Sequence, residues 1–315
     1  MRFDIVSLGE PLYEFSQIPG RSREYLQGFG GDTSNCAVAA ARQGARVAYL
    51  SRLGDDEFGK QFRELWQHEG MDVSGVGIDP DAHTAVYFIS HGASGHQFSY
   101  LRKGSAASMI RPEHLPREIL TSTRFFHTSG ITQAISPSAC DSASTAIGIA
   151  KAAGAQFVYD ANIRPRLWPA ERARAVVGAT IAAADIFLLS REDADVLCGL
   201  ERPEEILDWC HGRGASRVVL KLGVEGAIAS EGSRRWRVTP YKVDAVDATG
   251  AGDCFAGAAM ARLAAGDRMD AALDYASAAA ALTCSGFGAV DPVPRPDAVR
   301  ALMAGGSASR PYRAG

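Results

Sequence analysis

Short runs rich in β-branched residues alternate with longer alanine-rich runs along most of this 315-residue chain. The runs typical of strands cover residues 3–8, 46–53, 124–130, 156–160, 185–190 and 217–223. The runs typical of helices cover residues 34–43, 56–69, 137–153, 170–184, 191–211, 251–265 and 269–283. This alternation predicts an α/β fold with a mostly parallel sheet that helices cover on both faces. In such sheets, ligands bind at the carboxyl ends of strands, where loops enter helices.

Two segments, about 10–30 and 83–102, have strand character without intervening helices. In the second, "TAVYFIS" and "HQFSYLR" flank "HGASG", which predicts a hairpin. The two segments together predict a small β-structure that projects from the main sheet as a lid or a dimer surface. Two extra edge strands of the main sheet are the alternative. Residues 1–304 are expected to form one α/β domain, and residues 305–315 a flexible tail.

Composition excludes several classes of function. The formal net charge of −3 gives no general attraction to nucleic acid or to an anionic membrane. The six cysteines are scattered without a CxxC pair, which disfavours a zinc site or a disulfide framework and suits a reducing compartment. The N-terminus resembles a strand rather than a signal peptide, and no apolar run reaches the roughly 18 residues of a membrane span. A cytoplasmic protein is expected.

Two nucleotide-binding motifs can be set aside. The stretch "GDDEFGKQ" (54–61) has the glycine and lysine spacing of a P-loop, but Gln61 offers no hydroxyl to magnesium. Three acids also stand where backbone N–H groups would hold phosphate, so we interpret this stretch as a loop and a helix start. The first strand continues as "LGEPLYEF" without a Rossmann fingerprint, which disfavours a nicotinamide enzyme.

The stretch "DATGAGDCFAGAAMARLAAG" (247–266) places Asp253 in the first turn of a helix behind Gly250 and Gly252. The glycines allow a sharp turn, and the helix start offers unpaired N–H groups and a partial positive charge, which together make an anion site. The dipole is expected to favour the ionised form of Asp253. A substrate hydroxyl attacking a γ-phosphoryl group fits this pairing of a base with an anion site. An acidic helix cap is the alternative for this motif taken alone.

The same stretch resembles the C-terminal signature of the ribokinase-like (PfkB) carbohydrate kinases. Residues 28–59 resemble that family's N-terminal signature, residues 218–228 its nucleotide-binding strand and turn, and "SRED" (190–193) stands in place of its N-x-x-E motif. The resemblance implies a three-layer sandwich with a central, mostly parallel sheet and a small β-sheet lid. It also implies ATP as the phosphoryl donor, with Mg²⁺ held mainly by phosphates and water.

The resemblance further implies roles for individual residues. Asp253 would be the catalytic base, with Gly250, Ala251 and Gly252 as the anion hole. The nucleotide would contact Asn162, Arg164, Ser190, Lys221, Gly223, Gly226, Gly250 and Gly252. Asp193 replaces the glutamate of N-x-x-E, so a water-mediated metal role for it is in doubt. Asp247 and Thr249 fall where some relatives bind a monovalent cation, but residues 283–292 do not clearly supply the remaining ligands.

Two arginines point to a sugar acid, because a planar guanidinium can hold a carboxylate with two hydrogen bonds. They lie in "FSYLRKGSAAS" (98–108) and "DANIRPRLW" (160–168), which resemble segments of 2-keto-3-deoxygluconate kinases, as do residues 9–15 and 127–132. The resemblance implies that the keto-acid contacts Gly31, Asn35, Tyr87, Tyr100, Arg102 and Arg164. Leu101 replaces an aromatic residue of that subgroup. Alternatively, Arg102 is a solvated edge-strand charge and Arg164 caps a loop over Trp168.

We therefore expect an ATP-dependent kinase that phosphorylates the terminal hydroxyl of a 2-keto-3-deoxy sugar acid such as 2-dehydro-3-deoxy-D-gluconate. The gluconate and galactonate epimers are not distinguished. The alternatives are a kinase of the same fold for a neutral sugar, or a non-catalytic sensor. A homo-oligomer formed through the lid is expected. His127 is interpreted as a packed strand-end residue, and Glu10 as support for the lid hinge.

Overall fold

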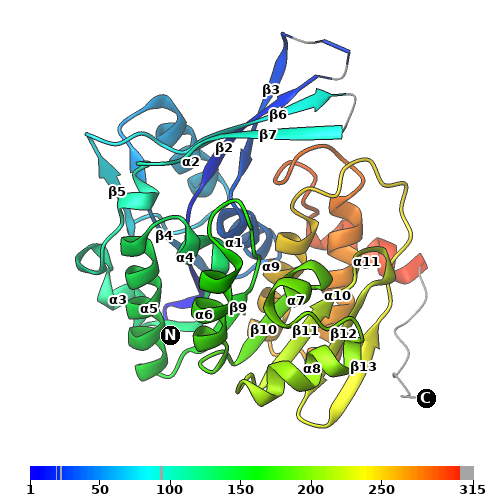
Figure 1. The fold of residues 1–315 in the computed structure, drawn as a ribbon. Helices are drawn as coiled ribbons and strands as arrows, with labels where there is room; N and C mark the ends of the chain where they lie inside the picture. The colour runs from blue at the N-terminus through cyan, green and yellow to red at the C-terminus, as the bar shows by residue number, and fades with distance from the viewer. Residues whose placement is uncertain (19, 22, 93–94, 306–315) are drawn as a thin grey trace.

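The computed structural model describes residues 1–18, 20–21, 23–92 and 95–305. Its main sheet has nine strands in the order β13-β12-β11-β10-β9-β8-β1-β4-β5 (Figure 1). Their bounds are β1 Phe3–Leu8, β4 Val47–Gly54, β5 Val76–Asp79, β8 Thr123–Ser129, β9 Gln156–Asp160, β10 Ile186–Ser190, β11 Arg217–Lys221, β12 Ala227–Glu231 and β13 Arg234–Val238. The strands from β11 to β5 run parallel, and the β11–β12 and β12–β13 pairs are antiparallel. The prediction of a mostly parallel sheet is confirmed.

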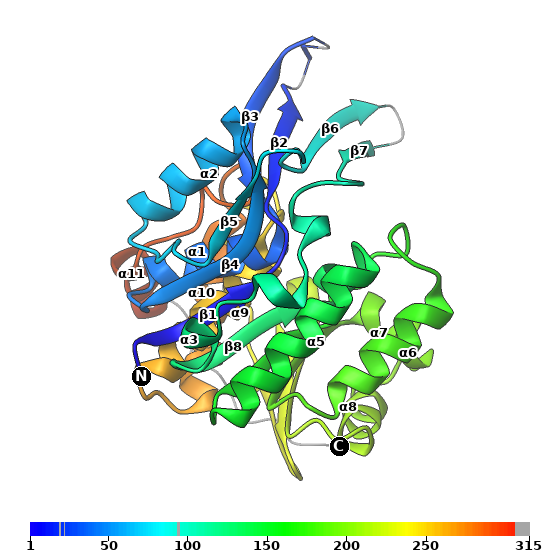
Figure 2. The ribbon, with the colours of Figure 1, turned by 90° about the vertical axis from the view of Figure 1, so that its left-hand side faces the viewer.

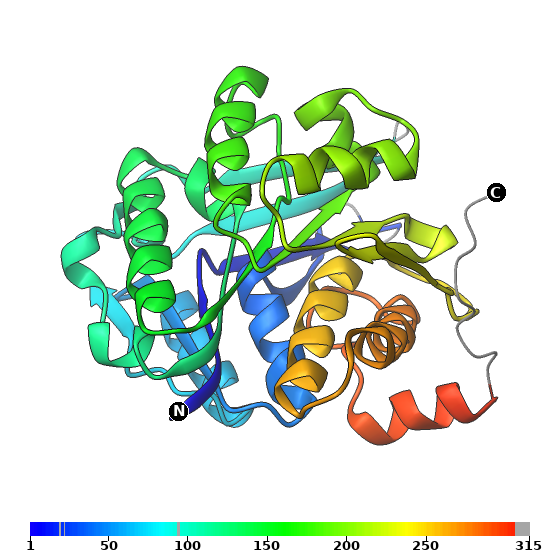
Figure 3. The ribbon, with the colours of Figure 1, turned by 90° about the horizontal axis from the view of Figure 1, so that it is seen from below.

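Helices cover both faces of this sheet, as Figure 3 shows from below. One layer contains α1 Asp32–Arg42, α2 Glu57–His68, α9 Ala251–Ala264, α10 Met269–Thr283 and α11 Pro296–Gly305. The other contains α3 Arg117–Leu120, α5 Pro137–Ala152, α6 Ala170–Ile181, α7 Arg191–Cys198 and α8 Pro203–Gly212, and a short helix α4, Gly130–Ala134, follows β8. Alternate residues of β10 face the two layers: Leu188 packs in the first core and Leu189 in the second.

A separate four-stranded sheet stands off the main sheet (Figure 2). Its strands are β2 Leu12–Gln17, β3 Tyr25–Gly30, β6 Val86–Gly92 and β7 Gly95–Leu101, in the order β3-β2-β6-β7. The β2–β6 pair is parallel and the two outer pairs are antiparallel. The small β-sheet lid is therefore confirmed, and the alternative of two extra edge strands in the main sheet is wrong.

The predicted elements differ from the structure in several places. The helical run 191–211 is two helices, because Gly199 adopts a left-handed conformation (φ 65°) and Pro203 begins the next helix. The hairpin of β12 and β13, the edge strand β5 and the helix α11 were not predicted. The predicted tail begins at the last residue of α11, and residues 306–315 lie outside the described residues.

The stretch that imitates a P-loop is a loop and helix start, as predicted. Asp56 caps α2 by accepting a hydrogen bond from the N–H of Gly59 (2.8 Å), and its other oxygen accepts from the N–H of Thr84 (2.7 Å). All six cysteines are free thiols. Within the described part of the chain, no helix is long and apolar enough to cross a membrane.

Candidate active site

Close packing of α1 against α9 brings the starts of the two helices together. A Cβ atom at Gly257 would lie 2.2 Å from the carbonyl oxygen of Cys36 and 2.9 Å from Cβ of Ala39, so only glycine allows this approach. At the helix starts, Asn35 Nδ2 donates to Asp253 Oδ2 (2.8 Å). The positive ends of two helix dipoles therefore point at one place, which favours a negatively charged ligand there.

The turn before α9 fits the predicted anion hole with one correction. Gly250 has φ 73°, and a Cβ there would lie 2.7 Å from the carbonyl oxygen of Ala289, so the turn requires glycine. The N–H of Ala251, however, donates to Ala248 O (3.2 Å). The N–H groups of Gly252 and Asp253 lie in the first turn of α9, where no carbonyl of the helix stands four residues before them. These two donors are therefore available to an anion.

Asp253 differs electrostatically from the prediction. Burial, reinforced by the Asp32 carboxylate, raises the pKa of Asp253 to about 7, although the hydrogen bond from Asn35 opposes the rise. The helix dipole was expected to favour the ionised form of this carboxyl, but the loss of water around it has the larger effect on its pKa. Near neutral pH the group titrates, which suits a general base.

A small cavity beside Asp253 collects side chains from several elements. It is lined by Asp32, Cys36, His127, Asp160, Asn162, Asp253 and Ala256. Asn162 Nδ2 donates to Asp32 Oδ2 (2.8 Å), and Asn162 has the unusual φ of 35° for a residue other than glycine. Asn162 therefore lines the same cavity as Asp253, whereas the resemblance placed it near the nucleotide.

Asp32 and Asp160 were not singled out from the sequence. Asp32 follows the glycine pair that starts α1, and Asp160 is the last residue of β9, at the binding edge of the sheet. These two positions, after a glycine pair and at the end of a strand, were the sequence features that could have identified Asp32 and Asp160 as site residues. The described residues contain no group of three or more His, Cys, Asp or Glu side chains arranged to hold a metal ion.

His127 is packed, as predicted. Its Nδ1 lies 2.8 Å from Ser7 Oγ, and burial lowers the pKa of His127 to about 4. The ring is therefore neutral at physiological pH, and its low pKa makes it a weaker base than Asp253.

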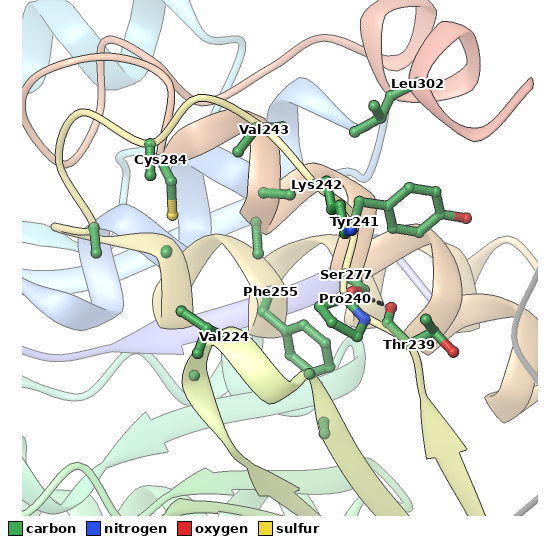
Figure 4. A pocket seen from close by; sticks show the side chains of 18 of the residues that line it. Val224, Thr239, Pro240, Tyr241, Lys242, Val243, Phe255, Ser277, Cys284 and Leu302 are labelled. Carbon is green, nitrogen blue, oxygen red and sulfur yellow. Dashed lines mark hydrogen bonds between the residues drawn. The ribbon is translucent and has the colours of Figure 1, made fainter. Parts of the chain in front are cut away.

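A second, larger cavity of about 1230 Å³ lies on the other side of the start of α9 (Figure 4). Predicted nucleotide residues that line it are Lys221, Gly223, Gly226 and Gly252. Its walls include the apolar side chains of Val224, Pro240, Tyr241, Phe255 and Leu302, which lie around the opening in Figure 4. An apolar cavity that ends at an anion site has the form that a nucleotide requires. Asn162, Arg164, Ser190 and Gly250 do not line it.

Asp193 and Ser190 hold a helix start. Asp193 accepts hydrogen bonds from the N–H groups of Ser190 (2.8 Å) and Ile163 (2.7 Å), and Ser190 Oγ accepts from the N–H of Asp193 (3.1 Å). Both carboxylate oxygens of Asp193 thus accept hydrogen bonds from the backbone. The water-mediated metal role of Asp193 stays a prediction. Asp247 similarly braces the turn, accepting from the N–H of Thr249 (2.9 Å) and of Gly288 (3.0 Å).

The lid places Arg102 at its junction with the main sheet. Arg102 follows the end of β7 rather than lying within it, and its guanidinium forms an ion pair with Glu10, which is completely buried. Ser105 Oγ also donates to Glu10 (3.0 Å). The guanidinium lies 5.5 Å from the Tyr100 ring centre, and Tyr100 stacks on Tyr87 at 5.8 Å. The interpretation of Glu10 as a lid support agrees with this arrangement.

The lid cluster adjoins the glycine pair that precedes α1. A Cβ at Gly30 would lie 2.8 Å from the Tyr87 hydroxyl, and one at Gly31 would lie 2.3 Å from the carbonyl oxygen of Glu10. Arg164, by contrast, is exposed and donates to its neighbour Ile163 O (3.0 Å). The structure therefore brings the lid residues to the start of α1. That Arg164 contacts both the keto-acid and the nucleotide stays a prediction.

Known proteins resemble this chain over nearly its whole length. A 2-dehydro-3-deoxygluconokinase of Thermoproteus tenax is 34% identical over 310 residues, which cover 95% of this chain and 94% of that protein. Fructokinase-1 of Oryza sativa subsp. japonica is 33% identical over 315 residues, covering 95% and 97%. A crystal structure from E. coli, solved in complex with ATP and Mg²⁺, has a TM-score of 0.89 and 25% identity, covering 96% of this chain and 99% of that one.

The family model for the pfkB carbohydrate kinases matches residues 3–296. That match includes the lid, the glycine turn and the carboxyl group at the start of α9, which form the site described above. This chain belongs to the PfkB family of carbohydrate kinases.

Proposed function

We propose that this kinase transfers the γ-phosphoryl group of ATP to the terminal hydroxyl of a 2-keto-3-deoxy sugar acid, with 2-dehydro-3-deoxy-D-gluconate as the substrate to test first. The observation that carries the proposal is the position of Arg102. Its guanidinium lies beside the stacked pair Tyr87 and Tyr100, next to the glycines that start α1. A guanidinium there suits the carboxylate of an acid whose far hydroxyl reaches Asp253.

The reaction needs no covalent intermediate with the protein. The hydroxyl oxygen of the sugar attacks the γ-phosphorus, and the bond from that phosphorus to the bridging oxygen of ATP breaks, leaving its electron pair on ADP. Asp253 accepts the proton of the hydroxyl. The N–H groups of Gly252 and Asp253 stabilise charge on the transferring oxygens. The larger cavity would hold the nucleotide, and Mg²⁺ would enter with ATP, held by phosphates and water.

A neutral sugar such as fructose is the second candidate. Sequence identity does not separate the two, because the fructokinase of Oryza sativa is 33% identical to this chain and the 2-dehydro-3-deoxygluconokinase of Thermoproteus tenax is 34% identical. In addition, Glu10 already neutralises the charge of Arg102 in the structure. A sugar acid must therefore share the guanidinium with Glu10, whereas a neutral sugar need not.

The test compares kcat/KM for 2-dehydro-3-deoxy-D-gluconate and for fructose in a coupled ADP assay. We expect Arg102→Ala to lower kcat/KM for the acid by about 10- to 100-fold, the value of a charged hydrogen bond, with little effect on fructose. Arg52→Ala is the matched control, because the Arg52 side chain is buried to a similar extent and also pairs with a carboxylate, Asp79 (2.9 Å), at the edge of the main sheet. An equal loss for both sugars in Arg102→Ala would show that the acid is not the preferred substrate.

A further inference from the structure

Lys221 links the two cavities of the active site. It is the last residue of β11 and lines the larger cavity, while its Nζ lies 2.6 Å from Oδ2 of Asp160, at the end of β9. The strand β10 runs between β9 and β11, so the lysine side chain crosses its carboxyl end to reach the aspartate. The two side chains are 18% and 5% exposed, which makes this a buried ion pair.

The amino group also lies against the predicted anion hole. A Cβ atom built on Gly252 would be 3.6 Å from Nζ of Lys221. Glycine at this position therefore leaves the ammonium group beside the first N–H groups of α9. Both sources of positive charge face the place where the phosphoryl group must pass between the nucleotide cavity and Asp253.

The charges around Lys221 come from four elements. The carboxylates are Asp160 on β9, Asp193 on α7 and Asp253 on α9, and the neutral ring of His127 on β8 is the fourth titratable neighbour. Burial opposes the charged form of Lys221, but the Asp160 and Asp193 carboxylates outweigh it, so the pKa of Lys221 is raised. The amino group is thus kept cationic in a cleft where its charged neighbours are carboxylates.

Resting on the proposed use of ATP, we propose that Lys221 is a catalytic residue that contacts the transferring phosphoryl group, and that Asp160 is its positioning residue. An ammonium group has three donors. One is used by Asp160, and the other two are available to oxygens of the γ-phosphoryl group and of the bridging position, where charge develops as the bond to ADP breaks. Without a cation here, the phosphoryl group would approach Asp253 through a field of carboxylates.

The alternative is that this ion pair only ties β9 to β11. Kinetics of two variants separate the readings. We expect Lys221→Met, which keeps the length of the side chain, to lower kcat by about 100- to 1000-fold. The affinity for ADP, measured by calorimetry, should change only a few-fold, because the interaction strengthens in the transition state. Lys221→Arg should recover part of the loss.

The positioning role has a signature in the pH profile. In Asp160→Asn the buried lysine loses its counter-ion, so its pKa should fall by about one unit or more. We expect the kcat of the wild type to stay level between about pH 8 and 10, and that of Asp160→Asn to decline with rising pH in the same range, from a maximum reduced roughly 10- to 100-fold. If the ion pair had only a structural role, Asp160→Asn would change thermal stability without producing this decline of kcat at alkaline pH.

Lys151→Met is the matched control. Lys151 also pairs with an aspartate, Asp185 (2.9 Å), but at the opposite end of the sheet, and its loss should leave kcat and the pH profile unchanged. All variants are assayed with whichever sugar of a panel gives the highest wild-type kcat/KM, so a wrong substrate assignment does not affect the comparison. A folded Lys221→Met with kcat within threefold of the wild type, or with equal losses in kcat and ADP affinity, would overturn the catalytic role. A level profile in Asp160→Asn would overturn the positioning role.

Discussion

Replacement of Asp253 by asparagine should remove activity and, at alkaline pH, stabilise the fold. The pKa of this carboxyl is raised from 3.8 to about 7 in the folded protein, first by burial and then by Asp32. The folded chain therefore holds the proton more tightly than the unfolded chain. The cost of ionising Asp253 is absent below pH 3.8, grows as the pH rises toward 7, and is complete above 7.

A shift of three units corresponds to about 4 kcal/mol of unfolding free energy, an upper value because the residue keeps partial contact with water. Asp253→Asn keeps an oxygen that can accept from Asn35 and never ionises. We therefore expect it to be more stable than the wild type by about 2–4 kcal/mol at pH 8. Below pH 7 the advantage should shrink by about 1.4 kcal/mol for each unit of pH.

The assay is urea unfolding followed by tryptophan fluorescence at pH 5, 6, 7 and 8 without nucleotide. Asp297→Asn serves as the control, because the Asp297 side chain is 96% exposed and should show no such trend. ADP release by Asp253→Asn should fall by at least about 100-fold, the contribution of a general base. A pH-independent difference in stability, or a loss of stability at pH 8, would refute the assignment of a buried, raised-pKa base.

Two further changes test the supports of the site. Gly257→Ala places a methyl group 2.2 Å from Cys36 O, so we expect urea unfolding to show a loss of about 1–3 kcal/mol together with reduced activity, whereas Gly148→Ala, on an open face of α5, should stabilise by about 0.5–1 kcal/mol. Equal effects of the two would contradict the close helix contact. Glu10→Ala leaves the partly buried Arg102 without its counter-ion and should cost about 3 kcal/mol, whereas the double variant Glu10→Ala/Arg102→Ala should be more stable than Glu10→Ala alone. A double variant of lower stability would show that the two residues act independently.

The main elements could be predicted because their signals are local. The β10 sequence is apolar and buried up to its last residue, Ser190, and the alanine-rich run of α9 begins at a glycine turn. The split of the helical run at Gly199 and the β12–β13 hairpin were harder to predict. A single glycine carries little periodicity, and β13 (RRWRV) is mostly charged.

The candidate site likewise has features that are local in the sequence and features that depend on long-range contacts. The glycine turn and Asp253 are adjacent in the chain and could be predicted from one motif. The contacts that define the cleft join residues far apart in the chain, so no single motif predicts them. Lys221 is 61 residues from Asp160, and Arg102 is 92 residues from Glu10. A sequence lists these charges but does not say which ones meet. For this reason the arginine was expected to be available to a substrate carboxylate, and the structure pairs it with a buried glutamate.

The raised pKa of Asp253 joins the stability of the fold to its chemistry. A carboxylate with the ordinary pKa of 3.8 would be fully ionised at neutral pH but would take a proton from an alcohol poorly. Burial makes the carboxylate a stronger base, and in the proposed mechanism the two helix starts and Lys221 supply positive charge where the phosphoryl group would pass. The same burial disfavours the ionised form in the folded state, so part of the fold's stability is given up to obtain this base. It follows that substitutions that return water to the cleft should lower the pKa of Asp253 and the rate together.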